Sequence, residues 1–238
     1  MYKHIFFDLD NTLTRSRSKI TPRMTRLLKK LSSKHDVIVV SGAEAKQIQF
    51  QLGPSLLRSY FIMGQNGNMC VTKAGESLWE RKMSWMQKLQ VLTYADRIIS
   101  KKLIRYKNIL DLVQDRGCQI SYSIIGHGEE IDKKEKCDPK QELRLRILRK
   151  FPFKSKDIEV KIGGTTCLDF FIKGFNKGKN VRELYRKMRW KRDECLYVGD
   201  ALFKNGNDET VIGVVPTRKV DDPRKTETII EELLRGKK

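Results

Sequence analysis

The chain has 238 residues, of which 39% are hydrophobic and 33% are charged, a composition typical of a globular protein that buries a sizeable core. No apolar run approaches the roughly 20 residues that a membrane-spanning helix needs, which argues against an integral membrane protein. The formal net charge is +20, from 49 basic and 29 acidic residues, and such a field attracts phosphorylated small molecules and polyanions alike.

The cysteines are an odd number, five, and they form no C-x-x-C pair. This spacing argues against a zinc site or a disulfide framework and suits a reducing compartment. The chain opens on a core strand and not on a signal peptide. We therefore expect a cytoplasmic protein.

Apolar runs and helical patterns alternate through the first part of the chain. A buried strand is expected at residues 4–7, followed by a helix at 22–31 that Thr21 caps and Pro22 opens. A second strand at 36–40 is followed by a helix at 43–52, which Gly53 closes. A further buried strand is expected at 194–198. Strands that alternate with helices predict an α/β fold with a parallel central sheet, whose chemistry gathers at the carboxyl ends of its strands.

The pattern changes between residues 82 and 160. Helices are expected at 85–103 and 106–115, then an alternating stretch at 118–124, a helix after Pro139 and a strand near 158–162. The charged segment 129–140 is expected to be a mobile loop. We interpret 82–160 as an inserted α+β domain, and 1–81 with 161–238 as the catalytic core.

Two aspartates, Asp8 and Asp10, follow the first strand directly. Side chains two residues apart in a strand point to the same side, so the carboxylates repel each other unless a cation or a phosphate-handling site uses them. Asp8 could attack a phosphorus atom, and Asp10 is placed to protonate the leaving oxygen. A solvated strand end is the alternative interpretation.

Other polar residues follow the later strands. Ser41 and Gly42 offer a hydroxyl and backbone N–H groups for phosphoryl oxygens, although a serine there also suits a helix cap. Lys177 opens a helix after the strand "CLDFFI" and could neutralise the phosphoryl group, or could simply be a surface lysine. Asp200 follows a strand and Asp208 is a second acidic position. Asp8, Asp200 and the Asp10 carbonyl could bind Mg²⁺, which prefers a few carboxylates, although a Gly/Asn turn before an Asp-rich helix start also explains this loop.

These residues fall in order on four known motifs: the pair Asp8 and Asp10, then Ser41, then Lys177, and the pair Asp200 and Asp208. The pattern resembles the haloacid dehalogenase superfamily, and the place of the insertion resembles its type-2 cap. Within the superfamily, nearly the whole chain is most similar to eukaryotic-type phosphomannomutases. The similar segments are "DLDNTLTRSRSKIT", "VSGAEAKQIQFQLG", "KIGGTTCLDFFIKGFNKGKNV" and "GDALFKNGND".

The resemblance implies a Rossmann-like core with a cap, and a reaction through an aspartyl-phosphate. It implies that Asp8 is the nucleophile, that Asp10 is the general acid and base, and that Ser41 and Lys177 hold the phosphoryl group. The implied cofactor is Mg²⁺, held by Asp8, Asp10, Asp200 and Asp208. The implied substrate contacts are Arg17, Gly42, Asp169 and Arg116. A homodimer that pairs through the cap is also implied.

One departure from the phosphomannomutases bears on the reaction. Those enzymes clamp a second phosphate with several cap arginines, whereas this chain has no arginine from Cys118 through Gln141. We therefore expect a magnesium-dependent phosphomonoester hydrolase acting on a phosphorylated sugar or a similar small metabolite. A phosphomannomutase is the first alternative.

The second alternative is a basic nucleic-acid-binding protein on an inactive hydrolase fold. From Phe171 to Arg192 there are nine basic residues and one acidic residue, but no signature of a nucleic-acid-binding family. Charge alone identifies no such partner.

Overall fold

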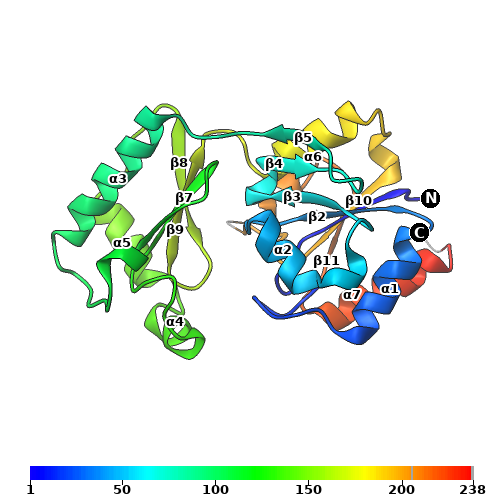
Figure 1. The fold of residues 1–238 in the computed structure, drawn as a ribbon, viewed down its shortest axis with the longest axis horizontal. Coiled ribbons are helices and arrows are strands. Elements are labelled where there is room, and N and C mark those ends of the chain that lie inside the picture. The colour runs from blue at the N-terminus through cyan, green and yellow to red at the C-terminus, as the bar shows by residue number, and fades with distance from the viewer. Residues whose placement is uncertain (205, 237–238) are drawn as a thin grey trace. The chain divides into compact units, whose positions relative to one another are not determined.

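The computed structural model describes residues 1–204 and 206–236 (Figure 1). The chain divides into two compact units: Met1–Glu80 together with Phe175–Lys238, called here the core unit, and Arg81–Gly174, called the inserted unit. Each unit has a sheet of its own and its own hydrophobic core. The expected architecture, a parallel core sheet with an inserted α+β module, is confirmed.

The core unit is built on a seven-stranded sheet in the order β11-β10-β1-β2-β3-β4-β5. Neighbouring strands from β11 to β3 are parallel, while β4 and β5 add an antiparallel hairpin at one edge. The strands are β1 (His4–Phe7), β2 (Asp36–Val40), β3 (Phe61–Gly64), β4 (Met69–Val71), β5 (Ser77–Glu80), β10 (Cys195–Gly199) and β11 (Thr217–Lys219).

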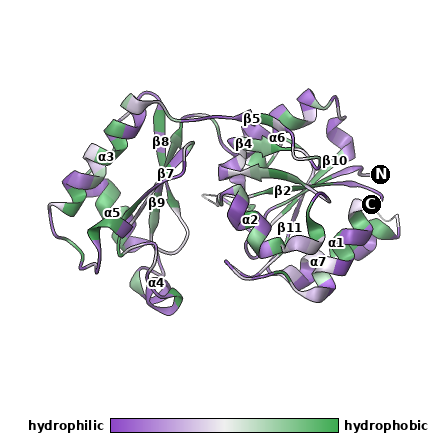
Figure 2. Cartoon of the chain, viewed as in Figure 1, coloured by the Kyte–Doolittle hydropathy of each residue, from purple (hydrophilic) through white to green (hydrophobic). Residues whose placement is uncertain are grey.

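Helices cover both faces of this sheet because its central strands are apolar on both sides. Ile5 and Phe7 of β1 pack in one cluster with residues of α1, α2 and α7, whereas Phe6 packs on the opposite face with α6. Figure 2 shows β2 as hydrophobic, while α1 alternates between hydrophobic and hydrophilic residues. The helices are α1 (Pro22–Ser32), α2 (Ala45–Leu52), α6 (Lys177–Lys187) and α7 (Pro223–Leu234).

The expected ends of the first two helices agree closely with the structure. The Thr21 hydroxyl accepts the backbone N–H of Met24 at 3.2 Å, and Pro22 is the first residue of α1. Gly53 ends α2 with a φ of +76°, a left-handed backbone that favours glycine. The start of α2 is Ala45, two residues later than expected. Four short 3₁₀ turns complete the core unit: Pro54–Leu56, Gln65–Gly67, Arg192–Glu194 and Glu209–Val211.

The inserted unit is an antiparallel sheet in the order β6-β7-β9-β8. One face of the sheet carries Ile120, Leu168 and Phe170, which pack with apolar residues of α3 and α5 in a single cluster. The elements are α3 (Trp85–Ile99), a 3₁₀ turn (Ile109–Asp111), β6 (Val113–Asp115), β7 (Gln119–Ser123), α4 (Ile131–Cys137), α5 (Glu142–Lys150), β8 (Ile158–Gly163) and β9 (Cys167–Ile172).

Two local predictions in this unit are wrong. The expected helix at 106–115 is instead the 3₁₀ turn and β6, because Val113, Gln114 and Asp115 pair with β7 as an edge strand. The expected mobile loop at 129–140 contains the helix α4. Its start is held by Glu129, which pairs with Lys107 and with Lys133 four residues on.

The return to the core unit also differs from the expected boundary at residue 161. The structure places it at Phe175, because β8 and β9 pair along their whole length and belong to the antiparallel sheet. Residues 161–174, Asp169 among them, therefore lie in the inserted unit. Among the described helices, none is long and apolar enough to cross a membrane.

Candidate active site

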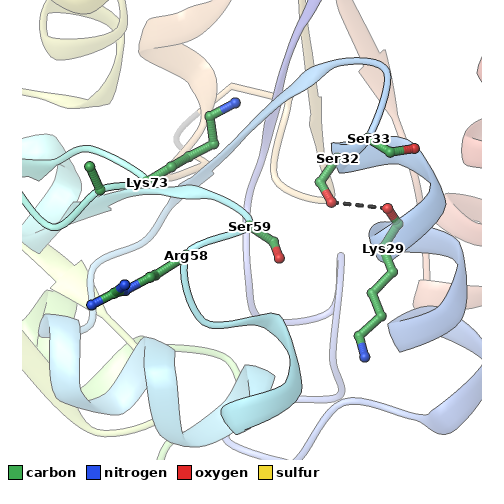
Figure 3. Close-up of a pocket in the computed structure, with 7 residues that line it drawn as sticks. Lys29, Ser32, Ser33, Arg58, Ser59 and Lys73 are labelled. Carbon is green, nitrogen blue, oxygen red and sulfur yellow. Dashed lines mark hydrogen bonds between the residues drawn. The ribbon is translucent and has the colours of Figure 1, made fainter.

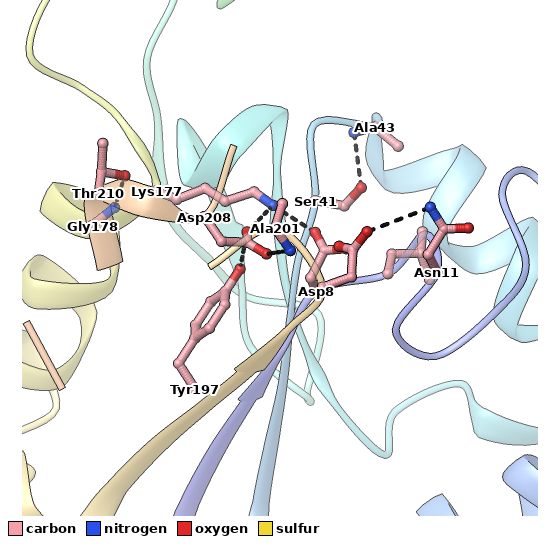
Figure 4. Close-up of polar contacts among 12 residues, drawn as sticks. Asp8, Asn11, Ser41, Ala43, Lys177, Gly178, Tyr197, Ala201, Asp208 and Thr210 are labelled. Atoms are coloured by element: carbon pink, nitrogen blue, oxygen red, sulfur yellow. Dashed lines mark hydrogen bonds and ion pairs between the residues drawn. The ribbon is translucent and has the colours of Figure 1, made fainter. Parts of the chain in front are cut away.

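The residues that follow three parallel strands of the core unit meet at one edge of its sheet. Phe7 at the end of β1 is paired with Val39 of β2 and with Val198 of β10. Asp8, Ser41 and Asp200 come next after these strands, so the parallel register brings them to the same edge. Figure 4 shows Asp8 and Ser41 together with Lys177 from the start of α6.

Lys177 is the centre of a buried charge network. Its ammonium donates to Asp8 Oδ1 at 2.5 Å and to Asp208 Oδ1 at 2.7 Å (Figure 4). Asp8, Lys177 and Asp208 are at most 3% exposed. This burial excludes a solvated strand end for Asp8 and a surface position for Lys177. Asn176 caps α6 by accepting the backbone N–H of Lys179 at 3.0 Å, which places Lys177 at the first helical position.

Asp208 is held by the strand beside it. The Tyr197 hydroxyl donates to Asp208 Oδ1 at 2.6 Å, and the backbone N–H of Ala201 donates to Oδ2 at 3.3 Å. A Cβ on Gly199 would lie 2.3 Å from Asp208 Oδ2, so only glycine fits between this carboxylate and the strand. Asp208 is thus fixed by contacts with Tyr197, Gly199 and Ala201.

Charge and burial oppose each other in this network. Burial raises the pKa of Asp8 well above its ordinary value, Lys177 lowers it, and Asp208 and Asp200 raise it further. Burial lowers the pKa of Lys177, but Asp208 and Asp8 outweigh it and raise that pKa overall. Burial and Asp208 raise the pKa of Tyr197, which stays a neutral hydroxyl donor. One lysine thus faces three carboxylates.

The carboxylate set fits a hard divalent cation. One oxygen from each of Asp8, Asp200 and Asp208 lies within 4.8 Å of the others. Burial and the nearby Asp208 raise the pKa of Asp200, as expected where like charges gather without enough counter-charge. All donors are oxygens, the ligands that Mg²⁺ prefers. The structure therefore joins three of the four predicted metal residues in one cluster.

The fourth predicted residue, Asp10, is held by contacts of its own. Its Oδ1 accepts the backbone N–H of Arg17 at 2.7 Å and the side-chain amide of Gln51 at 3.0 Å. Arg17 contributes this backbone contact from a left-handed conformation (φ +52°), and the residue itself is exposed. Asn11, also left-handed (φ +60°), donates to Asp200 Oδ2 at 3.5 Å.

Ser41 and Gly42 form the expected turn after β2. Ser41 is 3% exposed, and its hydroxyl accepts the backbone N–H of Ala43 at 3.1 Å. The cap of α2 is Glu44, so Ser41 is not the cap residue of that helix. The turn leaves room beside Gly42, whose nearest side-chain atom would be 3.6 Å from a Cβ.

Two of the predicted substrate contacts, Asp169 and Arg116, lie in the inserted unit. Asp169 Oδ1 accepts the Ser121 hydroxyl at 2.6 Å across the paired strands β7 and β9. The Arg116 guanidinium donates to Gln114 Oε1 through Nη2 at 2.9 Å.

Two residues that hold the site were not singled out from the sequence, Tyr197 and Gln51. Tyr197 lies inside an apolar strand, where an aromatic residue indicates only a buried position. Gln51 interrupts the apolar face of α2 next to Leu52, and a polar residue at a buried helical position is a detectable signal.

A hollow lined by basic and hydroxyl side chains lies elsewhere in the core unit. It measures about 440 Å³ and is lined by Lys29, Ser32, Ser33, Arg58, Ser59, Lys73 and Ala74. Figure 3 shows its three cationic side chains pointing away from one another. Lys73 is already paired with Asp36 at 2.6 Å. The hollow therefore lacks the converging charges that a phosphate site needs.

Comparison with known proteins gives a consistent assignment. The family model described as haloacid dehalogenase-like hydrolase matches residues 5–212. Among curated proteins, a phosphomannomutase of Spinacia oleracea is 28% identical over 98% of this chain and 96% of its own length. A phosphomannomutase of Triticum aestivum is 30% identical over 86% of this chain and 84% of its own length.

Solved structures agree on the fold. A haloacid dehalogenase-like hydrolase from Bacteroides thetaiotaomicron has a TM-score of 0.64 at 16% identity. The alignment covers 98% of this chain and the whole length of that hydrolase. An IMP-nucleotidase of Plasmodium falciparum has a TM-score of 0.65 at 15% identity, over 98% of this chain and 68% of its own.

Proposed function

Because this chain belongs to the haloacid dehalogenase-like hydrolases, we propose that it is a magnesium-dependent phosphomonoester hydrolase. The proposed substrate is a phosphorylated sugar or a similar small metabolite. The observation that carries the proposal is the buried lysine between Asp8 and Asp208 at the carboxyl edge of the sheet. An ammonium at this place holds a carboxylate nucleophile and can stabilise a phosphoryl group beside it.

The proposed reaction has two steps on these residues. An Asp8 oxygen attacks phosphorus, the bond from phosphorus to the leaving oxygen breaks, and Asp10 supplies the proton that the leaving oxygen needs. Water then attacks the aspartyl-phosphate, Asp10 takes its proton, and phosphate leaves Asp8. Ser41, the Gly42 backbone and Lys177 hold the phosphoryl oxygens through both steps.

The proposed metal residues are Asp8, Asp200, Asp208 and the backbone carbonyl of Asp10. The three carboxylates fit Mg²⁺ because they are close together and outnumber the one lysine. When bound, Mg²⁺ offsets the negative charge of the phosphoryl group. Lys177 and the turn at Ser41 keep the nucleophile oriented.

The charges of the inserted unit favour hydrolysis over transfer to a second position on a sugar. Lys133 is paired with Glu129, and Lys134 donates to the backbone carbonyl of His127. Burial lowers the pKa of His127, which favours its neutral form. The next arginine, Arg144, is 1% exposed and bound to Asp138. Lys133, Lys134 and Arg144 are therefore engaged within the unit itself. Lys136 and Lys140, by contrast, are exposed lysines, which grip a phosphate less well than the bidentate arginine. Asp169 and Arg116 are proposed to recognise the non-transferred part of the substrate.

A phosphomannomutase is the second candidate, and a specific finding favours it. Curated relatives named phosphomannomutase match up to 98% of this chain. Both candidates use the same aspartyl-phosphate, and they differ only in whether water or a sugar hydroxyl accepts the phosphoryl group.

One assay separates the two candidates. Mannose-1-phosphate is incubated with the protein, Mg²⁺ and a hexose bisphosphate activator, and both inorganic phosphate and mannose-6-phosphate are measured. We expect phosphate release well in excess of isomerisation. Isomerisation in excess of phosphate release would remove the hydrolase proposal and leave the mutase.

The proposed homodimer and the proposed cytoplasmic location each have one supporting feature. An apolar stripe on α3 is exposed in the inserted unit: Trp85 (70%), Met86 (65%), Leu89 (43%) and Leu92 (37%). It supports a homodimer through this unit, which light scattering can check. The odd number of cysteines and the absence of a C-x-x-C pair from the sequence support a cytoplasmic location.

Nucleic-acid binding on an inactive fold is the remaining alternative. The buried Lys177 and the surplus of carboxylates around it support a working site instead. A gel-shift titration across salt concentrations checks the alternative, since phosphate contacts make binding steeply salt-dependent.

A further inference from the structure

Gln51 is a buried polar side chain beside the proposed acid-base residue. It lies in the last turn of α2 and is 1% exposed. Its Nε2 lies 3.0 Å from Asp10 Oδ1, 3.1 Å from Thr14 Oγ1 and 3.4 Å from the Ser18 carbonyl oxygen. A buried amide is costly unless its hydrogen bonds are made, so this side chain is kept here by its contacts.

The chemistry of the neighbours determines which way the amide points. A backbone carbonyl oxygen only accepts hydrogen bonds, so the NH₂ group must face Ser18, and Asp10 Oδ1 lies on the same side of the amide. On the other side, Gln47 Nε2 donates to Gln51 Oε1 at 3.2 Å. The NH₂ group of Gln51 thus faces Asp10.

A second donor reaches the same oxygen of Asp10. The backbone N–H of Arg17 donates to Oδ1 at 2.7 Å, from a left-handed backbone that arginine rarely adopts. Gln51 also stabilises this turn. Its side chain donates to the Ser18 carbonyl, and its backbone carbonyl accepts the backbone N–H of Ile20 at 2.8 Å. Oδ1 therefore has two N–H donors. Within residues 1–204 and 206–236 the structure gives Oδ2 no hydrogen bond.

We propose that Gln51 is a positioning residue that makes Oδ2 of Asp10 the oxygen that transfers the proton. This inference rests on the proposed function. Gln51 and the Arg17 N–H hold Oδ1 as a pure acceptor, which orients the carboxyl group and leaves Oδ2 for the substrate. The choice of the carboxyl oxygen that transfers the proton thus depends on the Gln51 amide, which acts through Asp10 and not on the substrate itself.

In the first step the leaving oxygen takes its proton from Oδ2 of Asp10. Asp10 begins protonated on Oδ2, an Asp8 oxygen bonds to phosphorus, and the bond from phosphorus to the leaving oxygen breaks. The electron pair stays on the leaving oxygen, which takes the Oδ2 proton and departs as an alcohol. In the second step water adds to phosphorus and gives its proton to Oδ2, the bond to Asp8 breaks, and inorganic phosphate leaves.

Substrates with different leaving groups test this assignment. An alkoxide from a sugar phosphate needs a proton to leave, whereas the phenolate of p-nitrophenyl phosphate leaves without one. Rapid-quench single-turnover rates with Mg²⁺ are measured for both substrates in the wild-type chain, Gln51→Leu and Gln51→Met. Gln49→Leu is the matched control, because Gln49 is an exposed glutamine on the same helix.

We expect Gln51→Leu and Gln51→Met to slow transfer from the sugar phosphate on the order of 100-fold, and from p-nitrophenyl phosphate less than about threefold. The control should match the wild type with both substrates. In an Asp10→Asn background, Gln51→Leu should add no further loss, because the two residues act as a unit.

Other results overturn the inference. If the wild-type chain transfers phosphate and both substrates slow equally in Gln51→Met, Gln51 has only a structural role. If the wild-type chain transfers phosphate and neither substrate slows, Gln51 does not position Asp10. If the wild-type chain transfers phosphate from neither substrate, the proposed function fails and this inference fails with it.

Discussion

Arg144 of the inserted unit and Lys177 of the core unit are each 1% exposed and bound by carboxylate groups, but the two cations are satisfied in different ways. Arg144 of the inserted unit donates to Asp138 Oδ2 at 2.7 Å and to the carbonyl oxygens of Gly163, Gly164 and Cys167. One guanidinium faces one carboxylate. In the core unit, Lys177 binds two carboxylates and Asp200 lies beside them, so negative charge is in excess.

This difference separates a structural site from a chemical one. A buried ion pair with matched charge and filled hydrogen bonds holds a fold in place but attracts nothing. A buried group with surplus charge is stable only if a cation or a proton joins it; burial first, and then the neighbouring carboxylates, raise the pKa of Asp8 and the pKa of Asp200. Surplus buried charge, more than burial of charge itself, is what marks the candidate active site.

The largest effect is expected for Asp8→Asn. The amide is nearly isosteric but cannot attack phosphorus, so turnover should fall on the order of 10⁴-fold or more. Lys177 keeps its bond to Asp208, and the thermal midpoint should therefore change little. Phosphate release and differential scanning calorimetry measure the two quantities. Turnover near the wild-type rate would show that Asp8 is not the nucleophile.

Removal of the metal is expected to cause the next largest loss of activity. Excess chelator should lower phosphate release at least about 100-fold, and added Mg²⁺ should restore it, since the phosphoryl charge then lacks its counter-ion. Mg²⁺ should also raise the thermal midpoint of the wild-type chain, because it binds the folded state. An Asp200→Asn variant should lose most of that thermal shift. Full activity in chelator would contradict the metal assignment.

Methionine substitutions of Lys177 and of Arg144 compare the two units directly. Lys177→Met leaves two buried carboxylates unpaired, and Arg144→Met leaves Asp138 and three carbonyls without their donor. Each should destabilise the folded state by about 3–5 kcal/mol in urea unfolding. Only Lys177→Met should also abolish p-nitrophenyl phosphate turnover in the protein that remains folded. Equal loss of turnover in both variants would break the distinction between the sites.

The smallest effect is expected at Glu129. Hydrogen bonds from Lys133 and Lys107 hold the pKa of this carboxyl at about 2. Because the folded pKa lies below the unfolded value of roughly 4.3, the stabilisation is complete above that value and is lost as the pH falls toward 2. Glu129→Gln should lower the thermal midpoint slightly at pH 7, and the difference from wild type should vanish at low pH. A constant difference across that range would contradict this account.

The elements that could be predicted from the sequence are those decided by local physics. The first strand, the start of α1 at Thr21 and Pro22 and the end of α2 at Gly53 depend on apolar runs and on cap chemistry that lie within a few residues. The catalytic candidates could be found from local sequence for the same reason, because Asp8, Ser41 and Asp200 each directly follow a recognisable buried strand. Motif order then identified the family across most of the chain.

The remaining features depend on contacts between distant segments, which no local pattern contains. Residues 113–115 form a strand and not a helix because β7 offers them an edge, and residues 161–174 join the inserted unit because β9 pairs with both β7 and β8. The hydrogen bonds from Tyr197 to Asp208 and from Gln51 to Asp10 also depend on contacts between distant segments. Hydrogen bonds between side chains 11 and 41 residues apart become readable only when the fold has brought their elements together, because their strength depends on distance and direction.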